Sequence, residues 1–103
     1  SRGLGDVYKR QLAMVYNGRA MGAVVPPGTI VLLKAIDADA IIPGEEYVIV
    51  CQKIVTLRIV RAADAEGKYR LVPGDRENFD DIVVNASDIT SVYKVKGKLI
   101  INS

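Results

Sequence analysis

Hydrophobic and polar residues alternate along most of this chain, and turn-forming residues separate the alternating runs. A period of two places successive side chains on opposite faces and is typical of β-strands. Helical periodicity is weak throughout. The pattern predicts strands at residues 12–16, 29–36, 47–52, 54–61, 68–72, 82–84 and 93–101.

Two of these runs carry further information. The run at 29–36 is continuously apolar through Leu33, which is typical of a strand covered on both faces. The last run places three lysines at every second position, which indicates one face exposed to water. Polar loops separate the strands at 37–44, 64–67 and 73–81. Short strands joined by polar loops predict a compact, mostly β domain.

The first eleven residues differ from the rest, because they show no apolar periodicity and resemble a translated adapter sequence. We therefore expect residues 1–11 to be a non-native or disordered leader and residues 12–103 to form the domain. Removing Arg2, Lys9, Arg10 and Asp6 from the 14 basic and 12 acidic residues leaves 11 of each. A domain that grips DNA needs a basic footprint, and this neutral domain shows none.

Several classes of site and location are disfavoured by composition. One cysteine and no histidine argue against an intrachain disulfide and a zinc site. Cys51 follows an apolar run without a histidine partner, so we expect it in the core. The chain has neither an apolar run of membrane-spanning length nor a secretory signal pattern, which predicts no membrane partner and a cytoplasmic location. Asp37, Asp39, Asp80 and Asp81 are interpreted as solvated loop carboxylates rather than cation ligands.

A short motif precedes the second predicted strand. Gly18 opens a turn that contains Ala20 and Met21, and Gly28 follows eight residues after Ala20. This register resembles the active-site turn of the LexA-type and phage-repressor peptidase family, in which Gly-x-Ser-Met is followed by a glycine eight residues after the serine. Ala20 falls at the position of the nucleophile. Ala23 replaces a proline that the family carries after the turn.

Three later segments resemble the same family, in the same order. Residues 56–61 resemble the Thr-Val-Lys-Arg-Leu strand, in which the lysine is the general base. Residues 71–84 resemble a Leu-x-Pro-x-Asn-x-x-(Phe/Tyr) stretch with its following strand, and residues 89–101 match the last strands, which the family uses for dimer contacts. The resemblance implies a compact LexA/signal peptidase-like β fold of short, strongly bent strands.

The resemblance also implies that the catalytic pair has been lost. Ala20 presents a methyl group where a nucleophile needs a lone pair. Arg58 falls at the base position, with one residue of slack in the alignment, and a guanidinium stays protonated and has no acceptor. Lys53 is a poor substitute because it lies at a predicted turn. We therefore expect no active catalytic residue, no cofactor and no metal.

The function predicted from these observations is a non-catalytic dimerisation or oligomerisation domain of a phage- or prophage-type transcriptional repressor. Its relatives read DNA through an N-terminal helix-turn-helix segment, which is absent here, so a homodimer is the expected partner. The candidate interface residues lie in the last strand and are Tyr93, Val95, Leu99 and Ile101. Two alternatives stay open: a Ser/Lys self-cleaving or signal-peptidase-like enzyme with an engineered or degenerate active site, and a small β-barrel adaptor that shares the motifs by chance.

Overall fold

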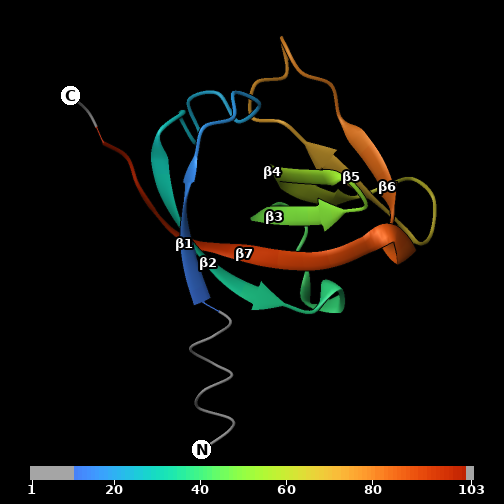
Figure 1. The fold of residues 1–103 in the computed structure, drawn as a ribbon. Coiled ribbons are helices and arrows are strands. Elements are labelled where there is room, and N and C mark those ends of the chain that lie inside the picture. Colours follow the sequence, from blue (N-terminus) through green and yellow to red (C-terminus); the bar gives the residue numbers. More distant parts are fainter. Residues whose placement is uncertain (1–10, 102–103) are drawn as a thin grey trace, which may run out of the picture.

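The computed structural model describes residues 11–101, in which seven strands form a single antiparallel sheet (Figure 1). The strands are β1 (Gln11–Tyr16), β2 (Thr29–Ile36), β3 (Glu46–Cys51), β4 (Ile54–Ala62), β5 (Lys68–Val72), β6 (Ile82–Asn85) and β7 (Ile89–Leu99). Two short 3-10 turns, η1 (Ala38–Ala40) and η2 (Ala86–Asp88), lie in the connections. The expectation of a compact, mostly β fold is confirmed.

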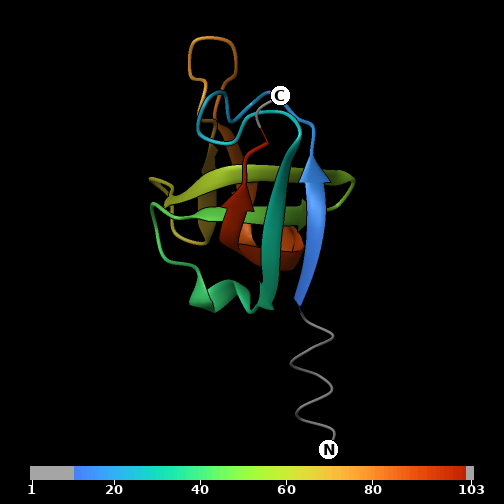
Figure 2. The same cartoon turned by 90° about the vertical axis from the view of Figure 1, so that its left-hand side faces the viewer.

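The strand order is β1-β2-β7-β3-β4-β5-β6, so the last strand lies in the middle of the sheet. β7 pairs with β2 along one edge and with β3 along the other. The sheet is strongly bent: in Figure 2, β1 and β2 run across the direction of β3 and β4. β-bulges between Leu32 and Leu33 and between Val50 and Cys51 contribute to this bending.

The bent sheet has two hydrophobic clusters on opposite faces of β3 and β4. Val48 and Leu57 belong to the first cluster, whereas Tyr47, Ile49 and Val60 belong to the second. The first cluster comprises Tyr16, Met21, Val25, Val31, Leu33, Val48 and Leu57. The second comprises Tyr47, Ile49, Cys51, Val60, Leu71, Val84 and Val92. Both faces of the central strands are therefore covered, which explains why these strands are apolar on both sides.

The strands lie close to their predicted positions, with the largest difference at the last one. The pattern predicted a strand at 93–101, but β7 already begins at Ile89 and ends at Leu99. Its first residues pair with the end of β3, where Val92 opposes Ile49. Gln11, which the pattern assigned to the leader, is the first residue of β1; the rest of the expected leader lies outside the described residues. Between residues 11 and 101, no helix is long and apolar enough to cross a membrane.

Candidate functional site

The turn between β1 and β2 contains the motif that the sequence singled out. Backbone hydrogen bonds from Gly22 N to Arg19 O and from Val24 N to Met21 O, each 3.1 Å, close the turn. Met21 is fully buried in the first cluster, and Ala20 is 9% exposed. The turn therefore covers the first cluster, and the buried Met21 side chain fixes the turn to it.

Gly28 ends this connection and returns the chain to β2. Its φ of +92° lies in a region that residues with a Cβ rarely adopt. In this conformation its N–H donates to the carbonyl of Tyr16 over 2.7 Å, where β1 ends. The glycine at this position of the motif thus has a backbone role, independent of any catalytic chemistry.

The segment from Pro73 to Asp81 covers the turn from outside. Asp75 N donates to the carbonyl of Ala20 over 2.9 Å. The Asp75 carboxylate accepts hydrogen bonds from the backbone N–H of Asn78 over 3.2 Å and from the Asn78 side-chain amide over 2.9 Å. The side-chain bond lowers the pKa of the Asp75 carboxyl below its usual value. A hydrogen-bonded loop therefore holds the turn in place.

Arg58 of β4 holds the other end of the same segment. Its side chain is buried, with the residue only 6% exposed, and Nη1 donates to the carbonyl of Asp80 over 2.7 Å. Its Nε is buried without a hydrogen-bond partner among the described residues. No ion pair joins it to an acidic group between residues 11 and 101. A permanently charged donor in this setting positions a loop and accepts no proton.

Ala20 and Arg58 thus contact the same loop segment, one through Asp75 and the other through Asp80. The two faces of β4 carry different side chains at this point. Leu57 packs with Met21 in the first cluster, whereas Arg58, one residue later, lies on the opposite face and opposes Tyr47 of β3. The β4 side chain on the Met21 side is therefore aliphatic. The sequence interpretation did not include Leu57, which lies within the one-residue slack of the alignment.

The remaining polar candidates do not form a reactive cluster. Cys51 is buried in the second cluster, as expected. Asp81 pairs with Arg70 and Arg76 at 3.5 Å each. Lys53 lies in the exposed turn between β3 and β4. In the part of the chain that the structure describes, no three metal-ligating side chains converge on one point.

The four interface candidates, three in β7 and Ile101 just after it, divide into two pairs. Tyr93 and Val95 are half-buried and pack against the first cluster, whereas Leu99 is 59% and Ile101 is 64% exposed. A bulge causes this division: Leu33 pairs with Val95, but the preceding Leu32 pairs with Gly97. The extra residue of β7 turns the following part of the strand over, so that Leu99 faces outward.

The three lysines of β7 differ in whether they form ion pairs. Lys94 pairs with Glu45 at 2.9 Å and Lys98 with Glu46 at 3.1 Å, and the hydrogen bond that Lys94 donates to Glu45 raises the pKa of Lys94. Lys96 forms no ion pair with any residue from 11 to 101, and the same holds for Lys34 of β2.

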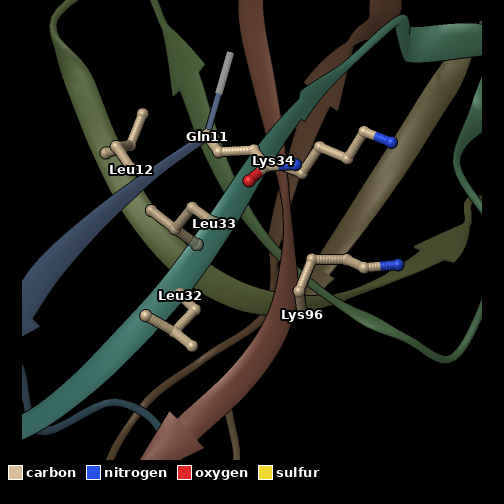
Figure 3. A pocket seen from close by; sticks show the side chains of 6 residues that line it. All are labelled: Gln11, Leu12, Leu32, Leu33, Lys34 and Lys96. Carbon is tan, nitrogen blue, oxygen red and sulfur yellow. The ribbon is translucent and has the colours of Figure 1, made fainter. Parts of the chain in front are cut away.

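A surface hollow of about 420 Å³ lies beside these two lysines (Figure 3). Its apolar lining comes from leucines of β1 and β2, and the ammonium groups of Lys34 and Lys96 extend to the other side of β2. The residues that line it are Gln11, Leu12, Leu32, Leu33, Lys34 and Lys96. Three of the six lining residues are leucines, so the hollow offers apolar contact.

No family model matches this chain, and no curated protein does either.

Proposed function

We propose that this domain is a non-catalytic self-association domain of a phage- or prophage-type transcriptional repressor, related to the LexA-type self-cleaving peptidases but without their Ser/Lys dyad. One observation carries the proposal: the turn that resembles the active site presents a methyl group at Ala20, and the adjoining strand offers Leu57 and Arg58. The spacing of Gly18 and Gly28 around residue 20 supports the resemblance, while the reactive groups are missing.

Peptide cleavage by a Ser/Lys pair requires a hydroxyl and a lysine that is neutral at working pH. Leu57 has no acceptor at all, and the Arg58 guanidinium stays protonated. The hydrogen bond from Arg58 to Asp80 gives the buried side chain a structural role instead. Two side chains would have to change before this site resembled a dyad in both composition and position.

A domain without catalysis still has a function in a repressor, because it can hold two DNA-reading segments together. Pairing matches two reading segments to two half-sites and raises their effective concentration without new base contacts. The balanced charge of residues 12–103 supports this division of labour, since the domain itself lacks a basic footprint.

A phosphonylating serine probe tests the loss of catalysis without knowledge of a substrate. We expect no labelling of the natural protein or of Ala20→Ser, because the hydroxyl gains no base. Two double variants compare a lysine on either face of β4. They are Ala20→Ser/Leu57→Lys and Ala20→Ser/Arg58→Lys, and only the former places an amine on the Met21 side. Labelling of Ala20→Ser alone at residue 20, shown by mass spectrometry, would favour the peptidase alternative and overturn this proposal.

Self-association is tested by light scattering on the natural protein. We expect a concentration-dependent mass that rises toward twice that of the monomer in the micromolar range. A strictly monomeric protein at high micromolar concentration would contradict the proposal.

A further inference from the structure

The register of the strands defines an apolar surface that lies outside both clusters. Residues directly opposite each other in antiparallel strands project from the same face. Val15 pairs with Ile30, which pairs with Leu99; Ala13 pairs with Leu32, which pairs with Gly97. These six residues form what we term the outer face, and none of them is charged.

The outer face is exposed in the described structure. Val15 is 54%, Leu32 is 51% and Leu99 is 59% exposed. The alternate residues of the same strands, such as Val31 and Leu33, are buried in the first cluster. An antiparallel sheet with one solvated face usually carries polar residues there. Because β1 and β2 are apolar on both sides, their second side is suited to an interface.

The outer face is flat at its centre and has a hollow at one end. Leu32 lies over Gly97, where an added Cβ would come to 3.4 Å from Leu32 Cδ1. The hollow of Figure 3 adjoins Leu32 and is flanked by Lys34 and Lys96. An uncharged centre with lysines at its border has the composition of a protein interface, in which a polar rim surrounds an apolar core.

We infer that the outer face is the surface through which a second copy of this chain associates, face to face around a two-fold axis, so that Val15, Leu32 and Leu99 of both copies become buried. This inference rests on the proposed self-association and names the surface that performs it. In a two-fold interface, a patch on one copy contacts the same patch on the other copy. The patch must therefore be complementary to itself. The outer face meets this requirement because two uncharged centres do not repel each other.

Charge and size favour a second copy as the occupant. Residues 12–103 carry 11 basic and 11 acidic residues, so no long-range repulsion opposes the approach of two copies. Sheets packed face to face lie about 10 Å apart, which lets side chains from both outer faces interdigitate. The uncharged centre spans three neighbouring strands, so two copies can match it over the same extent. We therefore expect a reversible dimer.

Lysine substitutions at exposed aliphatic residues test the surface. Val15→Lys and Leu32→Lys are expected to weaken dimerisation about 100-fold or more in light scattering, because each buries an unpaired charge in the interface. Val55→Lys on β4 and Val83→Lys on β6 are the controls, since these valines are 65% and 47% exposed on other surfaces. The controls are expected to dimerise as the natural protein does. Circular dichroism verifies that every variant is folded.

Cysteine cross-linking provides a second measurement that does not depend on weakened binding. Cys51 is buried, so Leu32→Cys introduces one accessible thiol near the middle of the outer face. We expect mild oxidation to yield a disulfide-linked dimer of Leu32→Cys and to leave Val55→Cys unlinked.

The outcomes distinguish a failure of the proposed interface from a failure of the proposed function. A monomeric natural protein would overturn both the proposed function and this inference. A dimer that keeps its stability in Val15→Lys and Leu32→Lys, and that forms no cross-link through Leu32→Cys, would leave self-association intact but show that another surface, such as the free edge of β1, performs it.

Discussion

Replacing Gly74 with alanine is expected to unfold most of the protein or to destabilise it by at least about 4 kcal/mol. A Cβ at this position would overlap the carbonyl oxygen of Met21 and would lie 2.8 Å from its carbonyl carbon. Both obstructing atoms belong to the backbone, so no side-chain rotation relieves the overlap. The segment 73–81 would have to leave the turn, which breaks the hydrogen bond from Asp75 to Ala20 and uncovers Met21.

Urea unfolding followed by circular dichroism measures this effect. Gly97→Ala is the matched control, because its added Cβ meets Leu32 at an ordinary contact distance of 3.4 Å. We expect the control to change the free energy of unfolding by less than about 1 kcal/mol at a protein concentration at which the natural chain is monomeric. If Gly74→Ala had the same urea midpoint as the natural protein, the close approach of the two backbones would be refuted.

The strands could be predicted from the sequence because their alternation is a local property. Residues 54–61, for example, alternate clearly and correspond to β4. The order of the strands could not be predicted in this way, since nothing in the pattern of residues 93–101 indicates that β7 lies between β2 and β3. Long-range pairing depends on which apolar surfaces fit together, and this information is distributed over the whole chain.

The faces of individual strands were less predictable than their positions. Uninterrupted alternation would place Val95 and Leu99 on one side of β7, but the bulge opposite Leu32 and Leu33 puts them on opposite sides. A single extra residue reverses every later side chain. Bulges leave no clear mark in a single sequence, so the sequence does not show that Tyr93 and Val95 pack against the first cluster while Leu99 faces outward.

The candidate site shows the same limit. The motif residues Gly18, Ala20, Met21 and Gly28 do form one turn, and the loop 73–81 does join that turn to β4. The missing hydroxyl is evident from Ala20 alone. The β4 residue that packs with Met21 is not evident from the sequence, because a one-residue uncertainty in a strand decides between Leu57 and Arg58, and these two side chains lie on opposite faces.

Arg58 itself provides the second large expected effect. Arg58→Ala is expected to destabilise the protein by about 3 kcal/mol, because it opens a cavity and leaves the Asp80 carbonyl without its donor. Arg58→Met keeps the length of the side chain and removes a charge that is buried without an acidic partner among residues 11–101. We expect this variant to lie within about 1 kcal/mol of the natural protein, since the lost hydrogen bond is offset by the avoided desolvation of the guanidinium.

The comparison of the two variants decides what the buried guanidinium contributes. If packing dominates, Arg58→Met unfolds at nearly the same urea concentration as the natural protein, and Arg58→Ala unfolds at a much lower one. Should both variants be equally destabilised, the hydrogen bond to Asp80 would be the principal contribution, and the orphaned Nε would have to gain a partner in solution, such as a bound water. Either result concerns the stability of the fold, because both substitutions act on the packing of the buried side chain and on its hydrogen bond to Asp80.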